Sequence, residues 1–80
     1  MNIREQIINY VNNNNLCKFA DLYMYIIDCS YDELVSNVYQ LIYEGELIQV
    51  KYYNDNNNKD NVGILFPKGT EIIINNFSTN

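Results

Sequence analysis

The chain has 80 residues and a formal net charge of −5, with only five Lys and Arg residues. Hydrophobic residues make up 48% of it, which is enough for a packed core and excludes a disordered tail. The length fits one small domain, assigned to residues 1–80. Because no apolar run approaches the roughly 18 residues of a membrane span, and no signal-type segment opens the chain, we expect a soluble cytoplasmic protein.

The residues needed for common catalytic and metal sites are missing. The sequence has no histidine, and its ten acidic residues are scattered rather than set at metal-ligand spacing. No Gly-rich phosphate loop precedes a predicted helix. Cys17 and Cys29 do not form a C-x-x-C pair and are expected to be small apolar core residues with free thiols. We therefore expect a protein that is not an enzyme and that needs no metal or cofactor.

The first predicted helix begins after Asn2, which is a favoured N-cap residue, and Glu5 follows three residues later as in a capping box. One side of this helix carries four apolar residues: Ile3, Ile7, Ile8 and Val11. The helix should end within the Asn run at residues 12–15, because Asn tolerates the left-handed conformation of turns. A second, short helix is predicted over residues 20–27. Its buried side is supplied by Leu22, Ile26 and either Met24 or Tyr25.

Residues 30–45 predict a complete helix with both ends marked. Ser30 is a favoured N-cap, and Glu33 completes a capping box. Gly45 stands where a helix end accepts a positive φ. The apolar stripe between them consists of Leu34, Val35, Val38, Leu41 and Ile42. A short helix, a tight turn at residues 28–30 and a capped second helix are typical of a helix-turn-helix, in which this second helix is the recognition helix.

Two strands are predicted after Gly45, over residues 46–53 and 62–66. Eight polar residues, 54–61, join them and indicate a flexible wing tip. In the return strand the apolar residues Val62, Ile64 and Phe66 alternate with Gly63 and Leu65, and Gly63 predicts a bulge or a close backbone approach. The expected core is Ile7, Val11, Leu22, Ile26, Leu34, Val38, Leu41, Leu47, Val50, Ile64 and Phe66.

Two passages resemble winged helix-turn-helix regulators. Residues 65–73, a strand followed by Pro-Lys-Gly, a variable residue and Glu-Ile, resemble the wing and C-terminal segment of MarR- and PadR-like proteins. Residues 39–48 resemble the passage of many winged helices in which a helix leads into Leu-x-x-x-Gly-x-Leu-Ile. The resemblance implies an α+β winged helix-turn-helix fold, with three helices, a two- or three-stranded wing sheet, a minor first strand at residues 16–19 and a short C-terminal helix. β-Propensity alone would make residues 72–74 a strand.

A DNA-binding function is the first hypothesis. Amide side chains on the predicted recognition helix can pair with adenine in the major groove, and a wing bearing Lys and Asn is suited to the minor groove of A·T-rich DNA. The predicted DNA-contacting residues are Lys51, Asn56, Asn57, Asn58, Lys59, Ser36, Asn37 and Gln40. The protein would then be a sequence-specific accessory or regulatory protein of a plasmid, phage or mobile element. Its wing would supply more of the affinity for AT-rich DNA than its recognition helix.

The charge pattern supports a second hypothesis. Residues 19–50 contain no Lys or Arg, and they contain six acidic residues: Asp21, Asp28, Asp32, Glu33, Glu44 and Glu46. Since affinity for a phosphate backbone comes largely from Lys and Arg, an acidic recognition face favours a protein-interaction module or DNA mimic that binds a basic partner. The eight tyrosines are more than so small a core holds, so some of them are expected to be exposed. Exposed Tyr is common at protein interfaces, and we expect a homodimer formed through the first helix or the tail helix.

Overall fold

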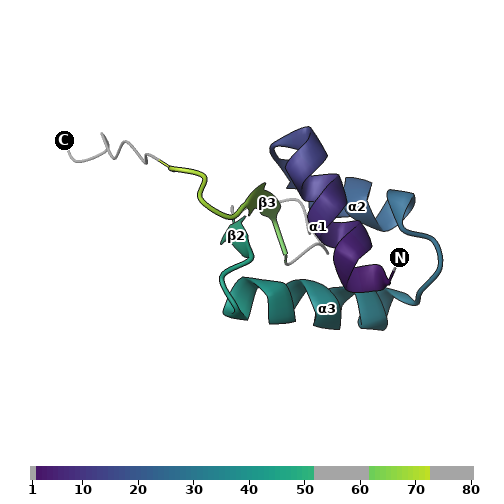
Figure 1. Cartoon of the computed structure of the whole chain (residues 1–80). Coiled ribbons are helices and arrows are strands. Elements are labelled where there is room, and N and C mark those ends of the chain that lie inside the picture. The colour runs from purple at the N-terminus through teal and green to yellow at the C-terminus, as the bar shows by residue number, and fades with distance from the viewer. Residues whose placement is uncertain (1, 52–61, 73–80) are drawn as a thin grey trace.

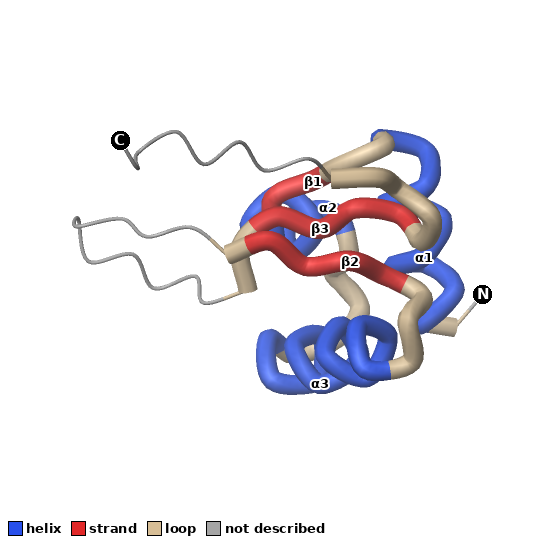
Figure 2. The backbone as a smooth tube through the Cα atoms, turned by 90° about the vertical axis from the view of Figure 1, so that its left-hand side faces the viewer, coloured by secondary structure: helices blue, strands red, loops and turns tan. Residues whose placement is uncertain are grey.

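The computed structural model describes residues 2–51 and 62–72. Within these residues the chain is a small α+β domain with three helices, α1 (Ile3–Asn14), α2 (Phe19–Tyr25) and α3 (Tyr31–Tyr43). The described strands β1 (Cys17–Lys18), β2 (Leu47–Val50) and β3 (Ile64–Pro67) form an antiparallel sheet in the order β1-β3-β2. The sheet forms one side of the molecule, and the helices pack behind and below it (Figures 1 and 2). The predicted sequence of helices and strands up to β3 is confirmed.

Both ends of α1 are fixed by local contacts that the sequence predicts. The Asn2 side chain accepts a hydrogen bond of 2.8 Å from the Glu5 backbone N–H. At the other end Asn15 adopts a left-handed conformation, with φ 65°. The helix therefore ends inside the Asn run because one Asn supplies the turn that breaks it.

The ends of α3 are equally well defined. Ser30 Oγ accepts a hydrogen bond of 3.1 Å from the Glu33 N–H. Past the last turn Gly45 has φ +84°. The Glu46 N–H donates to the Leu41 carbonyl at 2.9 Å, and the Gly45 N–H donates to the Ile42 carbonyl at 3.1 Å. This pair of bonds is a Schellman motif, which satisfies the last carbonyls of α3 and turns the chain directly into β2.

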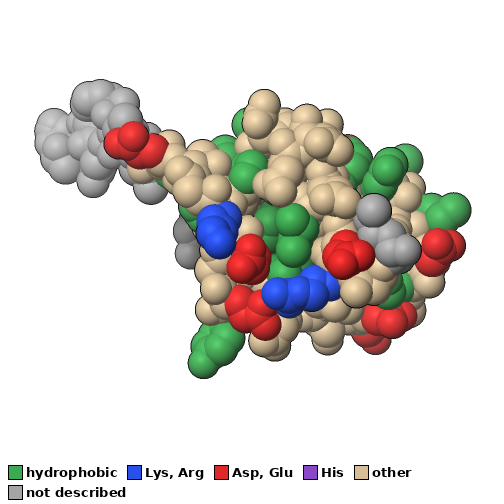
Figure 3. Space-filling model, in the orientation of Figure 1, with side chains coloured by type: hydrophobic (Ala, Val, Ile, Leu, Met, Phe, Trp, Pro, Cys, Tyr) green, Lys and Arg blue, Asp and Glu red, His purple; other side chains and the backbone are tan. Residues whose placement is uncertain are grey.

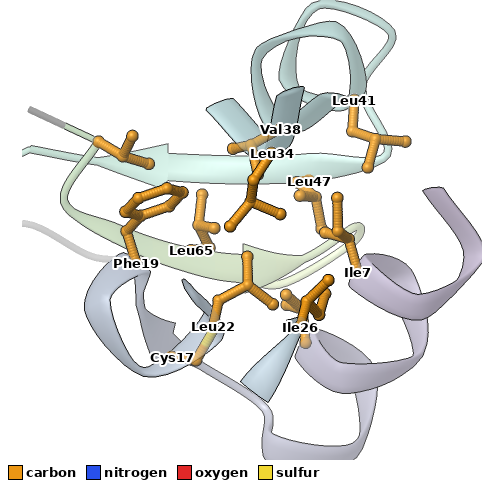
Figure 4. Packing of buried hydrophobic residues seen from close by; sticks show 12 residues of the cluster. Ile7, Cys17, Phe19, Leu22, Ile26, Leu34, Val38, Leu41, Leu47 and Leu65 are labelled. Carbon is orange, nitrogen blue, oxygen red and sulfur yellow. The ribbon is translucent and has the colours of Figure 1, made fainter. Parts of the chain in front are cut away.

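A single core fills the space between the helices and the inner face of the sheet (Figure 4). Leu34 of α3 and Leu22 of α2 point toward each other across it. The buried residues are Ile7, Val11, Cys17, Phe19, Leu22, Ile26, Leu34, Val38, Leu41, Leu47, Val62 and Leu65. The predicted core positions in the helices and at the start of β2 are thus confirmed, and the zero exposure of Leu41 confirms the predicted register of α3.

The predicted core positions Val50, Ile64 and Phe66 are wrong, because all three are only half-buried. In β3 it is Leu65 that is fully buried, and it lies opposite Cys17 and Gln49. Side chains alternate along a strand, so the residues on either side of Leu65 face outward.

The irregularity at Gly63 explains why the predicted alternation fails. Gly63 has φ +85°, so the chain bends between Val62 and β3, and both Val62 and Leu65 turn inward. A Cβ atom at Gly63 would lie 2.5 Å from the Val50 carbonyl oxygen, which confirms the predicted close backbone approach. The Gly63 carbonyl accepts from the Phe19 N–H at 3.1 Å, and Gln49 Nε2 donates to the Val62 carbonyl at 2.9 Å. The bend is therefore hydrogen-bonded on both sides.

The remaining fold predictions fall at the limits of the described chain. Residues 70–72 form neither helix nor strand, so the predicted C-terminal helix does not begin there. The rest of that segment, residues 73–80, and the predicted wing tip lie outside the described residues. Among the helices that are described, none combines the length and the apolar character needed to cross a membrane.

Candidate functional site

The outer face of α3 carries three of the residues predicted to contact DNA. Ser36 is exposed. Asn37 is half-buried, and its amide donates to the Glu33 carbonyl oxygen at 2.8 Å. The Gln40 amide donates to the Glu44 carboxylate at 2.9 Å. Recognition of adenine uses one N–H and the oxygen of an amide, so each of these two side chains would have to present those groups to the base in addition to its contact within the chain.

The C-terminal end of α3 is tied to α1 by an ion pair. The Arg4 guanidinium contacts the Glu44 carboxylate, and both side chains are partly exposed. The hydrogen bonds from Arg4 and then Gln40 hold the pKa of Glu44 below its ordinary value. The ion pair links α1 to the C-terminal end of α3 at the surface, so the Arg4 cation is already engaged by a carboxylate.

The other described cations lie on or beside the sheet. Lys68 Nζ is 3.8 Å from the Glu46 carboxylate. The basic side chains visible in Figure 3 accordingly lie against acidic ones. Lys18 and Lys51 make no ion pair with a described residue. Strand register places Lys18 opposite Ile64, which in turn lies opposite Val50, so Lys18 and Lys51 share the end of the sheet at which β2 ends and β3 begins.

Four exposed large apolar residues lie on α2 and the turn to α3. We call them the α2–turn patch, which consists of Tyr23, Met24, Ile27 and Tyr31, and they are 42%, 76%, 79% and 41% exposed. The Tyr23 and Tyr31 rings meet edge to face, with centroids 5.3 Å apart. Both rings also pack against Phe19, which is 2% exposed. The aromatic part of the patch is therefore anchored on the core.

Three acidic residues flank this patch in sequence. Asp21, Asp28 and Asp32 are all exposed, and each lies within three residues of a patch member in sequence. Figure 3 shows hydrophobic and acidic side chains along the edge of the molecule where the α2–α3 connection runs. Since residues 19–50 contain no Lys or Arg, no cation of this segment offsets the three carboxylates.

The α2–turn patch was missed from sequence because Met24 or Tyr25 was assigned to the buried side of the second helix. Both are exposed, Met24 at 76% and Tyr25 at 61%, so that prediction is wrong. The signal was present: five consecutive large apolar residues, 23–27, cannot all face the core from one short helix. In the structure α2 ends at Tyr25. Ile26 follows it in an extended conformation, and its side chain is buried in the core.

A second surface feature is an open hollow of about 400 Å³ between α1 and the end of α2. It is lined by Gln6, Asn9, Tyr10, Asn13, Asn14 and Tyr25. The Tyr10 and Tyr25 rings stack with centroids 4.4 Å apart. None of the lining side chains is a carboxylate, a cation or a thiol, so the hollow has no group suited to acid–base or nucleophilic chemistry near neutral pH.

The two thiols are free. Burial, with a smaller contribution from Asp21, raises the pKa of Cys17 to about 11. Burial and the nearby Glu33 and Asp28 also raise the pKa of Cys29. Both thiols therefore stay protonated at neutral pH and are poor nucleophiles. No group of three or more potential metal ligands occurs among the residues that the structure describes.

The remaining predicted site residues are only partly placed. Lys51 is exposed just after β2, whereas Asn56, Asn57, Asn58 and Lys59 lie outside the described residues. The predicted homodimer stays a prediction, and α1 carries none of the large exposed apolar side chains of the described chain. Comparisons of this chain with protein-family models, curated proteins and solved structures gave no match.

Proposed function

We propose that this chain is a winged helix-turn-helix domain that binds a basic partner protein through its α2–α3 unit. The winged-helix assignment is supported by the order of its elements, α1-β1-α2-α3-β2-β3, and by the strand order β1-β3-β2. It is also supported by the capped α3, which turns through Gly45 directly into β2. The resemblance of residues 65–73 to MarR- and PadR-like proteins belongs to the same proposal. Because one fold serves many functions, the partner has to be argued from the surface.

One observation carries the choice of partner: every charged side chain between residues 19 and 50 is acidic. If α3 entered a major groove, Asp32 and Glu33 in its first turn would approach the flanking phosphates. A carboxylate held about 7 Å from a phosphate costs roughly 0.6 kcal/mol in bulk water and about 2 kcal/mol at an effective dielectric constant of about 20. Against a cluster of Lys and Arg the same groups attract, so the α2–α3 face favours a basic protein.

DNA binding through the wing is the second candidate, and a separate observation favours it. Lys18 and Lys51 share the end of the sheet at which the predicted wing begins, and neither is paired with a described residue. In this alternative the protein contacts AT-rich DNA as a dimeric accessory protein of a plasmid, phage or mobile element. Few phosphate contacts would give weak binding with a shallow salt dependence.

Fluorescence anisotropy with two labelled probes, a Lys-rich peptide and an AT-rich duplex, tests the proposal at two salt concentrations. The proposal predicts that the peptide binds more tightly and that the double variant D32N/E33Q weakens peptide binding. The double variant K51A/K59A should leave peptide binding unchanged. Circular dichroism of each variant is needed, because Asp32 and Glu33 also stabilise the N-terminus of α3 by about 0.3–1 kcal/mol each. Duplex binding that is lost in K51A/K59A, with no peptide binding, would instead establish the wing-led alternative.

A further inference from the structure

We infer that the partner presents an amphipathic basic helix, whose apolar side chains seat on the α2–turn patch while its Lys or Arg residues meet the surrounding carboxylates. This inference rests on the proposed function and specifies the partner's chemistry. Its strongest support is the coincidence of two features on one segment: the most exposed aliphatic side chains of the described chain, and three exposed acidic residues with no Lys or Arg among them.

The patch is held in an exposed position by its own backbone. Phe19 and Leu22 fix the buried side of α2, and Met24 lies on the opposite side at helical spacing. Ile26 is extended, with φ −95° and ψ 101°, and its side chain is 1% exposed. Since neighbouring side chains of an extended segment point in opposite directions, burial of Ile26 directs Ile27 outward. Met24 and Ile27 can therefore not be withdrawn into the core without breaking the α2–α3 turn.

The neighbouring tyrosines give this surface its interface character. Tyr23 and Tyr31 are about half-exposed, and their contacts with each other and with Phe19 restrict the rings. Restrained Tyr rings offer large contact area at a low cost in conformational entropy, and Met adapts its shape to an incoming side chain. Together they form the apolar centre that protein interfaces use, with a polar rim outside it.

The acidic border selects among the possible occupants. Asp21, Asp28 and Asp32 would repel a nucleic-acid backbone or an anionic membrane surface. A second copy of this chain docking patch to patch would bring the same carboxylates against each other, which disfavours a symmetric dimer here. A cationic segment is attracted instead. In the patch, Met24 and Ile27 are flanked in sequence by Asp21 and Asp28. A partner helix that carries apolar side chains at helical spacing, with Lys or Arg beside them, matches this arrangement.

The test uses the full chain and two labelled synthetic peptides of about five helical turns. One peptide places Leu on one face and Lys on the other, and the second keeps every Lys but replaces each Leu with Ser. Binding is measured by anisotropy for the parent and for the double variant M24S/I27S. The variant L16S is the matched control, because Leu16 is 49% exposed and lies outside the patch. D28N is compared with E71Q, since Asp28 and Glu71 are both exposed and only Asp28 borders the patch.

We expect the Leu/Lys peptide to bind at least about tenfold more tightly than the Ser/Lys peptide, as central apolar anchors dominate binding energy. M24S/I27S should abolish that difference, L16S should keep it, and D28N should weaken binding of both peptides more than E71Q does. If both peptides bind equally, or if M24S/I27S binds the Leu/Lys peptide as the parent does, the inference is overturned while the proposed function stands. If neither peptide binds, the proposed function fails with it. Thermal melting curves show that each variant remains folded.

Discussion

Replacing Gly63 with Ala should be the most damaging single-methyl change in the described chain. Gly63 has φ +85°, and an added Cβ would lie 2.5 Å from the Val50 carbonyl oxygen and 3.0 Å from the Lys51 Cα. The positive φ alone costs a residue other than Gly about 1–2 kcal/mol. Relief of the overlap requires β2 and β3 to separate, because both contacts are with backbone, and overpacking of this kind costs about 1–3 kcal/mol more. The expected loss is therefore roughly 2–5 kcal/mol.

Gly69→Ala is the matched control for this change. Gly69 has φ +87°, nearly the same as Gly63, but an added Cβ would meet nothing within 4 Å. It should lose only the conformational term of about 1–2 kcal/mol. Urea unfolding followed by circular dichroism measures both losses, and a shift of midpoint at constant slope reports a change in stability. If Gly63→Ala were no less stable than Gly69→Ala, the close approach of Gly63 to β2 would not hold, and our account of the β3 register would fail with it.

Three further changes test other parts of the fold. Leu41→Ala should lower the free energy of unfolding by about 2–5 kcal/mol, because Leu41 has zero exposure, and a loss below 1 kcal/mol in urea unfolding would contradict its burial. Ser30→Ala should cost about 1 kcal/mol through the lost N-cap bond, whereas Ser36→Ala on the exposed face of α3 should change stability by less than about 0.5 kcal/mol. Glu44→Gln should remove part of the pH dependence of stability. The pKa of Glu44 in the folded protein lies below its ordinary value of 4.5, so its stabilising contribution is present above pH 4.5 and is lost as the pH falls through the pKa of the folded state. Melting curves of parent and variant should therefore converge on acidification, and parallel curves would argue against the contact with Arg4 in solution.

Features fixed by local hydrogen bonds were predictable from the sequence. The caps at Asn2 and Ser30 and the left-handed turn at Gly45 depend on residues three to five positions apart, and all were confirmed. The core positions of α1 and α3 followed from helical spacing for the same reason. Long-range pairing was less accessible. The sequence separates Arg4 and Glu44 by 40 positions, and no local pattern links them.

The errors in the predicted buried residues have two physical causes. The prediction assumed that buried and outward side chains alternate regularly from Val62 through Gly63 into β3. The positive φ of Gly63 interrupts this alternation, so Leu65 is buried and its neighbours face outward. Helical spacing was likewise carried past Tyr25, although Ile26 is extended and leaves Met24 and Ile27 exposed. The acidic character of residues 19–50 was evident from the sequence. Its coincidence with an exposed apolar patch required the fold.

Mapping of amide chemical shifts by NMR tests the central claim most directly, because it locates binding as well as detecting it. The chain is titrated in parallel with the Leu/Lys peptide and with an AT-rich duplex under the same buffer and salt. We predict that the peptide shifts amides concentrated at residues 23–33 and that the duplex leaves α3 unperturbed. A duplex-induced shift pattern centred on residues 36–40, with no peptide-induced change at residues 23–33, would contradict the assignment of the α2–α3 face to a basic protein partner.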